Sequence, residues 1–177
     1  LYTQKESAQL PAEEVFKVDQ GDNFGWPYCY YDWMQDEKVL MPEYGGDGQM
    51  VGRCDQFEEP VQAFPGHWAP NDVLFYTGTR FPEQYRGGAY IAWHGSWNRA
   101  PLPQQGYKVT YSPFDGARPA GDYKVFAGDF AGADTLAGPG EAEYRPTGLA
   151  VGPEGSLYVS DDTQGRIWRI AYVGAND

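Results

Sequence analysis

Two histidines lie in loops beside tryptophans and are the first candidates for chemistry in this sequence. His67 stands in the stretch 66–70 (GHWAP), and His94 stands in the stretch 93–99 (WHGSWNR). Neither has a His-Glu-x-x-His motif or a carboxylate-rich flank, so neither has the surroundings of a metal ligand. Two interpretations remain for each imidazole: a half-buried ring that packs on the neighbouring indole, or a ring that faces a ligand where loops converge.

A flat ring, an amide and a guanidinium follow one another at Trp97, Asn98 and Arg99. This set suits a planar anionic ligand, because arginine forks onto carboxylates and an indole stacks on rings. Cation–π packing at the surface explains the same residues equally well. Arg145 directly precedes Pro146, at the expected start of a strand, and has the same two interpretations.

Cys29 and Cys54 are the two cysteines of the chain, and they bracket a glycine-rich loop. Without a Cys-x-x-Cys spacing, a zinc or redox motif is not supported. A disulfide closing the loop would contribute roughly 3–4 kcal/mol by chain entropy and would imply an exported protein. The alternative is two unrelated buried thiols.

Three further signals are weak. The glycine-rich stretch 45–48 (GGDG) is not followed by a helical pattern, so it indicates a turn and not a phosphate-binding loop. Ser96 lies outside a Gly-x-Ser-x-Gly frame, which leaves a nucleophile elbow unsupported. Asp161 and Asp162 precede Thr-Gln-Gly, a pattern that favours a turn over a calcium site.

Composition narrows the class of protein that could hold these residues. The 177 residues include 13 Lys and Arg against 25 Asp and Glu, for a net charge of −12. Such a surface repels phosphate backbones and anionic membranes, and no stretch approaches the ~20 apolar residues of a membrane span. Aromatic residues make up 16% of the chain, beside 23 glycines and 14 prolines, which favours short strands and tight turns over a helix bundle or disorder.

Short apolar runs closed by glycine or proline predict the strands. They fall at 73–76, 89–93, 107–111 and 123–126, and then at 147–151, 156–160 and 166–172. The last run has apolar residues on both faces, so we expect it to be covered on both sides. One short helix is expected at Ala12–Lys17.

The strand pattern repeats, with Pro70 and Pro146 at equivalent starts. A meander of three or four strands that recurs at variable spacing is typical of a β-propeller blade. The sequence thus predicts an all-β chain with a loop-rich blade at 1–69, a blade at 70–127 and a partial final blade at 145–172. Since so few blades cannot close a ring, we expect the C-terminal part of a larger propeller, in keeping with a first residue, Leu1, that is not methionine.

Five motifs in order resemble the sorbosone dehydrogenase branch of the soluble pyrroloquinoline quinone (PQQ)-dependent sugar dehydrogenases. They are GDNFGWPYCYYD at 21–32, HWAP at 67–70, FYTGTRFP at 75–82, HGSWNR at 94–99 and GSLYVSDD at 155–162. The resemblance implies a six-bladed propeller, of which this chain covers about the C-terminal half, with PQQ and Ca²⁺ at its central face. It also implies a periplasmic or secreted enzyme that oxidises a sugar, sugar aldehyde or polyol and passes electrons to a haem protein or a dye.

The resemblance assigns roles residue by residue. His94 and Arg145 match contacts to the cofactor, with Trp97 and Arg99 beside them, while His67 and Trp68 match a loop on the substrate side. The glucose-oxidising relatives carry a second arginine where this chain has Thr147, which weakens any claim of the same grip or substrate. The general-base histidine and the carbonyls that hold calcium belong to the family's N-terminal half, so this chain alone should not turn over.

Two other functions fit parts of the pattern. A non-catalytic propeller that binds glycans or proteins would keep the scaffold without the chemistry, since a fold does not determine function. A calcium-dependent lactonase on a similar propeller would need metal-binding carboxylates and asparagines that this chain does not assemble.

Overall fold

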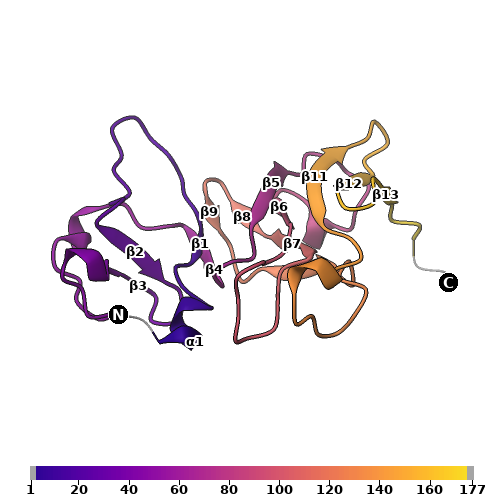
Figure 1. Ribbon diagram of the computed structural model, residues 1–177. Coiled ribbons are helices and arrows are strands. Elements are labelled where there is room, and N and C mark those ends of the chain that lie inside the picture. Colours follow the sequence, from indigo (N-terminus) through magenta and orange to yellow (C-terminus); the bar gives the residue numbers. More distant parts are fainter. Residues whose placement is uncertain (1–2, 175–177) are drawn as a thin grey trace.

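Short antiparallel strands make up almost all of the regular structure (Figure 1). The computed structural model describes residues 3–174. Over that range the only α-helix is the single turn α1 (Gln4–Ser7), and no helix is long and apolar enough to cross a membrane. Four 3₁₀ turns complete the helical elements of the range: η1 (Pro42–Tyr44), η2 (Cys54–Gln56), η3 (Glu83–Tyr85) and η4 (Pro139–Glu141). The nearly all-β class is therefore confirmed.

Two small hairpin-like pairs form the N-terminal lobe, at one end of the molecule in Figure 1. Strand β1 (Glu13–Val15) pairs with β4 (Gln62–Phe64), and β2 (Cys29–Asp32) pairs with β3 (Glu37–Leu40). A disulfide joins Cys29 to Cys54 with a Cα–Cα distance of 5.9 Å, which confirms the predicted pairing. Leu10, Tyr30 and Val39 form a small core beneath β2 and β3.

The helix expected at Ala12–Lys17 is wrong. Residues 13–15 are extended as β1, because their backbone groups pair with Gln62–Phe64 and tertiary pairing overrides a weak local helix preference. The helical turn lies earlier, at α1, where Thr3 Oγ1 accepts a 3.2 Å hydrogen bond from Glu6 N and Glu6 Oε2 accepts one of 2.6 Å from Thr3 N. This capping box is visible in the sequence as Thr-x-x-Glu.

A four-stranded antiparallel sheet occupies the middle of the chain. Its spatial order is β10 (Lys124–Ala127), β7 (Lys108–Ser112), β6 (Ala89–Trp93) and β5 (Pro70–Phe75). A two-residue pair, β8 (Phe114–Asp115) with β9 (Arg118–Pro119), lies in the connection from β7 to β10. All four strands lie within two or three residues of the predicted ranges, because each is a β-branched or aromatic run ended by turn residues.

A three-stranded antiparallel sheet follows, in the order β11 (Pro146–Val151), β12 (Leu157–Asp161) and β13 (Ile167–Ile170). Its first two strands repeat a detail of the preceding sheet. Pro70 pairs with Trp93 before a register shift in β5, and Pro146 pairs with Asp161 before the same shift in β11. The two prolines therefore begin equivalent strands, as their spacing predicted.

Strand β13 departs from expectation, because only one of its faces is covered. Ile167 is 71% exposed, whereas Trp168 packs edge-on against Phe130 and Tyr144 with ring centroids 5.1 and 5.0 Å apart. On the other face Arg169 donates to Ser156 Oγ at 3.1 Å and pairs with Glu154 at 3.0 Å, and β13 forms an edge of its sheet among residues 3–174.

The two larger sheets pack against each other through β11, which lies beside β5 and β6 (Figure 1). Hydrogen bonds cross the contact: Tyr76 Oη donates to Gly155 O at 2.6 Å, and Leu149 N donates to Asp72 Oδ2 at 2.7 Å. The buried core between them is mainly aromatic and aliphatic, with Tyr76, Phe81, Tyr90, Tyr107, Val109, Tyr111, Phe130, Leu136, Ala142, Leu157 and Val159. This packing brings the starts of β5 and β11 together.

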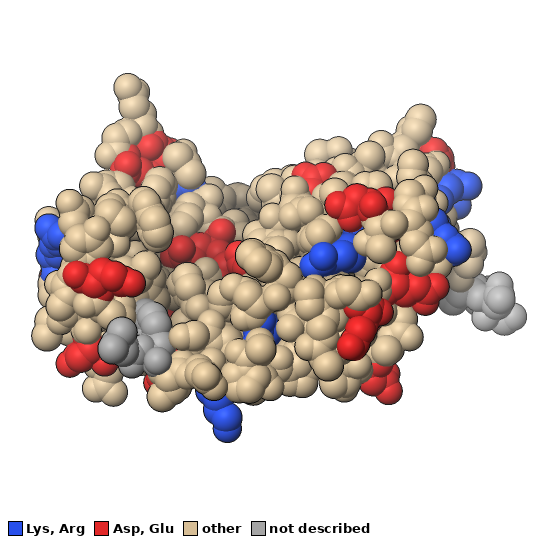
Figure 2. Space-filling model, in the orientation of Figure 1, with Lys and Arg blue, Asp and Glu red and all other residues tan. Residues whose placement is uncertain are grey.

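Carboxylates outnumber basic side chains, as the net charge of −12 requires. Figure 2 shows several separate acidic patches on the visible face, with fewer basic patches and a mostly uncharged surface between them.

Candidate functional site

The candidate site forms where the first strands of the two larger sheets begin and their second strands end. His94 directly follows β6 and Asp162 directly follows β12, so the two residues occupy equivalent positions in the two sheets. His94 Nε2 lies 3.0 and 3.2 Å from the two carboxylate oxygens of Asp162. The side chain of His94 is 19% exposed and that of Asp162 is 56% exposed, so the pair lies at the surface with the imidazole on the inner side.

Arg145 holds the loop after β6 against the start of β11. Its Nε donates to His94 O at 3.1 Å, and its Nη2 donates to Gly95 O at 2.7 Å and to Ser96 O at 3.4 Å. Its guanidinium carbon also lies 5.5 Å from the centroid of the Tyr107 ring. Arg145 thus connects the histidine loop to the second sheet, and its side chain also contacts the Tyr107 side chain.

Tyr107 and Gly95 fix the shape of the histidine loop. Gly95 has φ +98°, and a Cβ there would lie 2.1 Å from the Tyr107 ring, so a larger residue would displace the loop. Tyr107 Oη donates to Ser96 O at 2.6 Å, and burial raises the pKa of Tyr107 although the nearby Arg145 acts to lower it. The tyrosine therefore stays a neutral donor at physiological pH.

Ser96 has a structural role in the same loop. It is fully buried; its hydroxyl donates to Gln104 Oε1 at 2.7 Å and accepts from Gln105 N at 2.8 Å. A hydroxyl engaged in this way has no access to a substrate, in agreement with the missing nucleophile motif.

Asp161 organises the turn that carries Asp162. Its carboxylate accepts hydrogen bonds from Arg145 N at 2.7 Å, Thr163 N at 3.1 Å and Gln164 N at 2.7 Å. Burial acts to raise the pKa of Asp161, but these backbone donors outweigh it and hold the pKa below its usual value. The hydrogen bonds from Thr163 N and Gln164 N confirm the turn interpretation of this stretch.

We expect Asp161→Asn to lower the free energy of unfolding at pH 7 by about 1–3 kcal/mol, because the amide nitrogen replaces an oxygen that accepts a backbone N–H. A carboxyl with a lowered folded-state pKa contributes stability above its unfolded-state pKa and loses it as the pH falls through the folded-state value. The difference between variant and wild type should therefore shrink in acid. Urea unfolding of the full-length protein at pH 7 and pH 3 measures it, with the exposed Asp115→Asn as the control; a constant difference would contradict the assignment.

The other predicted site residues lie outside the contact between His94 and Arg145. Arg99 is 3% exposed; its Nε donates to Pro103 O and its Nη1 to Gly66 O, both at 3.1 Å, so its guanidinium ties two loops together. Trp97 is adjacent in the chain and 71% exposed. His67 Nε2 lies 2.8 Å from Ser7 O, and Trp68 is buried with Nε1 donating to Gln105 Oε1 at 3.2 Å.

Asp162 and Tyr107 are the contacts of this site that sequence reasoning missed. Aligning the two repeats on Pro70 and Pro146 would have found Asp162, since it occupies the position of His94 in the next repeat. Tyr107 has no comparable signal, because its role depends on the path of the loop between β6 and β7.

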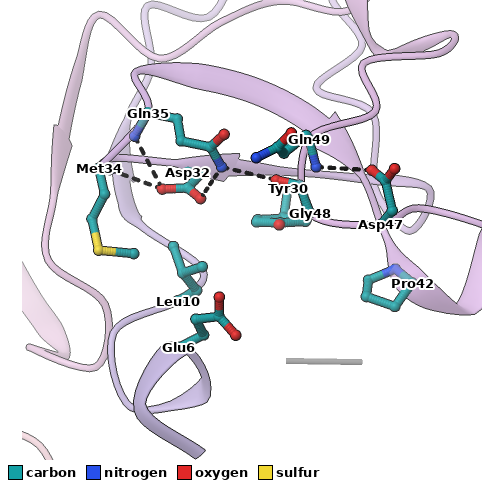
Figure 3. Close-up of a pocket in the computed structure, with 10 residues that line it drawn as sticks. All are labelled: Glu6, Leu10, Tyr30, Asp32, Met34, Gln35, Pro42, Asp47, Gly48 and Gln49. Carbon is teal, nitrogen blue, oxygen red and sulfur yellow. Dashed lines mark hydrogen bonds between the residues drawn. The ribbon is translucent and has the colours of Figure 1, made fainter. Parts of the chain in front are cut away.

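A separate cavity of about 390 Å³ lies in the N-terminal lobe (Figure 3) and shares no residue with the site above. Two of its three carboxylates cap backbone turns: Asp32 accepts from Met34 N and Gln35 N, and Asp47 accepts from Gln49 N. The Gln35 side-chain amide also bridges Asp32 and Gly48 O. These groups stabilise the lobe's own loops.

Proteins of known sequence are similar to this chain over most of its length. An uncharacterised protein of Borreliella burgdorferi is 30% identical over 166 residues, which cover 92% of this chain and 40% of that protein. A protein of Coprinopsis cinerea named pyrroloquinoline quinone-dependent pyranose dehydrogenase is 29% identical over 187 residues, which cover 90% of this chain and 25% of that protein. The chain thus spans less than half the length of these relatives.

Two solved structures share the fold. The iodide structure of Trichoderma reesei Carbohydrate-Active Enzymes Family AA12 has a TM-score of 0.69 at 23% identity, over 90% of this chain and 43% of that one. A crystal structure of glucose dehydrogenase has a TM-score of 0.58 at 20% identity, over 91% of this chain and 38% of that one. The family model described as TrAA12-like matches residues 6–173, and the chain therefore belongs to the TrAA12-like family.

Proposed function

We propose that this chain is the C-terminal portion of a PQQ-dependent dehydrogenase, of the sorbosone branch, that oxidises a sugar, sugar aldehyde or polyol by hydride transfer to the quinone. One observation carries the proposal. His94 and Arg145, which come from two successive sheets, are joined by a hydrogen bond at the ends where the sheets converge. A relative that matches 90% of this chain is named as a PQQ-dependent pyranose dehydrogenase, and it supports the same class.

The complete protein, on this proposal, is a six-bladed propeller with blades at 1–69, 70–127 and 145–172 in this chain. The repeated register of β5–β6 and β11–β12 and the packing of β11 on β5 support it, because neighbouring blades of a propeller place their inner strands side by side. The free edge of β13 leaves room for a fourth strand of the last blade.

The residues present fit an anionic, planar cofactor such as PQQ. Arg145 brings a guanidinium to the site for a carboxylate oxygen, with its Nε and Nη2 held by backbone carbonyls. His94 would orient an oxygen of the cofactor, and Asp162 would hold the imidazole ring in place through their 3.0 Å contact. When bound, PQQ supplies a two-electron acceptor for the hydride. The site would be bordered by the exposed Trp97 and by Arg99, whose guanidinium is held by backbone carbonyls. On the substrate side we place His67 and Trp68.

The remaining machinery is assigned to sequence outside this chain. The proposal places the general-base histidine and the Ca²⁺ ligands there, and the described residues offer no cluster of three side chains for a metal. The chain alone is therefore expected to be inactive. The Cys29–Cys54 disulfide supports export to the periplasm or the medium, where a haem protein or a dye would accept the electrons.

Titration of the full-length protein with PQQ and Ca²⁺ tests the proposal. We expect dye reduction that depends on both additions and on one member of a panel of sugars, sugar aldehydes and polyols. The expressed 177-residue chain, treated identically, should remain inactive. A full-length protein that neither binds PQQ nor turns over would contradict the proposal and favour a propeller that binds glycan or protein, in which Arg145 serves only to hold the histidine loop.

A further inference from the structure

A lysine whose ammonium lies on an indole ring, with no hydrogen bond or ion pair among the described residues, lines a cleft beside Tyr107. Lys108 begins β7, and its Nζ lies 3.5 Å from the centroid of the Trp68 ring. No hydrogen bond or ion pair reaches this Nζ from residues 3–174. The cleft measures about 530 Å³, and Trp68, Gln104, Gln105, Lys108, Tyr123 and Asp134 are among the residues that line it.

Burial makes it unfavourable in free energy to keep this ammonium charged without a hydrogen-bond acceptor. Desolvation, with a smaller contribution from Arg99, lowers the pKa of Lys108 to about 8. Lysines on folded proteins usually keep their head group in water, so a half-buried ammonium that faces a cleft without a carboxylate partner gains most from an anion supplied by a ligand.

The amides beside Lys108 offer unused donors. Gln104 Oε1 accepts from the Ser96 hydroxyl at 2.7 Å, and Gln105 Oε1 accepts from Trp68 Nε1 at 3.2 Å. Each side-chain oxygen thus already accepts one hydrogen bond, whereas neither NH₂ group donates to a described residue. The inner wall of the cleft thus presents an ammonium and two amide donors, a set that matches a carboxylate.

Acceptors lie at the outer rim. Asp129 and Asp134 line the cleft and are exposed, and Tyr123 presents a half-buried ring beside Trp68 with centroids 6.0 Å apart. Carboxylates accept hydrogen bonds from hydroxyl groups. They also repel negative charge, so they disfavour a ligand that is negatively charged over its whole surface. A fitting ligand therefore has one carboxylate at one end and several hydroxyls at the other.

We propose that this cleft binds a sugar acid of the hexuronate class, with its carboxylate on Lys108 and the two glutamine amides and its hydroxyls towards Asp129 and Asp134. A cleft of this size accommodates a single sugar residue with room to spare. The site does not depend on the proposed redox activity, because none of its groups needs a cofactor.

Titration calorimetry of the full-length protein without PQQ, at pH 6.5, tests the site with D-glucuronate against D-glucose. Wild type should bind glucuronate and discriminate against glucose by at least about 10-fold, the range for a hydrogen bond to a charged group. Lys108→Met keeps the stem over Trp68 and should weaken glucuronate binding by a similar factor, whereas Lys108→Arg should retain most of it. Lys124→Met removes an exposed charge from the same sheet and should change nothing. Equal binding of both sugars, no binding by wild type or full binding by Lys108→Met would each overturn the proposal.

The pH profile of wild type gives a readout that needs no variant. The charged or titratable groups near Lys108 are Arg99, Tyr107, Tyr123, Asp129 and Asp134. Burial raises the pKa of both tyrosines, so they stay neutral as Lys108 loses its proton. Glucuronate affinity should thus fall as the pH rises from 7 to 9.5, and a flat profile would contradict a role for the ammonium.

Discussion

Arg145→Ala is expected to lower the PQQ-dependent dye reduction of the full-length protein by about 100-fold or more, the range for truncating one partner of a desolvated charge pair. Two losses combine in this variant. The proposed cofactor carboxylate loses its guanidinium, and the carbonyls of His94, Gly95 and Ser96 lose the donors that fix the histidine loop. Steady-state rates at saturating PQQ, together with PQQ affinity measured by fluorescence quenching, separate the two effects.

Arg145→Lys and Arg118→Ala are the matched controls. Lysine keeps the charge but cannot reproduce the fork onto three carbonyls, so it should recover PQQ affinity only in part. Arg118 lies in β9, away from the site, and its removal should leave the rate unchanged. If Arg145→Ala binds PQQ like wild type and loses only thermal stability, the arginine is a structural connection between sheets and not a cofactor ligand.

Replacing both Cys29 and Cys54 with alanine is expected to lower the free energy of unfolding by roughly 3–4 kcal/mol. The bridge closes a segment with a sequence separation of 25, and both half-cystines are buried, so the unfolded chain gains freedom and the N-terminal lobe loses packing. Because that lobe has only two-stranded sheets, the loss should appear there first, as faster amide exchange in β2 and β3. Guanidinium unfolding of the full-length protein measures the total.

A reductant supplies the control for the disulfide. Dithiothreitol should lower the stability of wild type to that of the double variant and leave the variant itself unchanged. Equal stability of oxidised wild type and the double variant would mean that the loop is already ordered by its own hydrogen bonds, such as those that Asp47 accepts from Gln49 N and Met50 N.

The strands of the two larger sheets were predictable because their signal is local. Residues 89–93 form β6 without a shift at either end, since a run of only five residues, partly aromatic and closed by glycines, favours a strand over a helix. Errors arose where distant partners decide the outcome. Residues 13–15 are extended only because Gln62–Phe64 lie opposite, and Ile167 is 71% exposed although the apolar run that contains it predicts burial on both faces.

The candidate site, like the strands, was predictable only where the signal in the sequence is local. His94 and Arg145 could be named from motifs, but the use of Arg145 as a connection to backbone carbonyls depends on where β11 packs. Arg99 shows the limit most clearly, because its neighbours in sequence suggest a ligand contact while its guanidinium reaches Gly66 and Pro103 in the fold. Lys108 carries no motif, and the position of its ammonium on the Trp68 ring in a cleft is a property of the folded molecule alone.

The shared register of the two sheets has a consequence for how such a protein can diversify. The position after the second strand of the sheet holds His94 in one repeat and Asp162 in the next. The two backbones have the same strand pairing and the same register shift. Duplication of such a unit adds another side-chain position where the sheets converge. A point mutation at that position changes the chemistry of the side chain and leaves the backbone hydrogen bonds between the strands intact. Selection can therefore alter the reactive groups and the supporting framework almost independently.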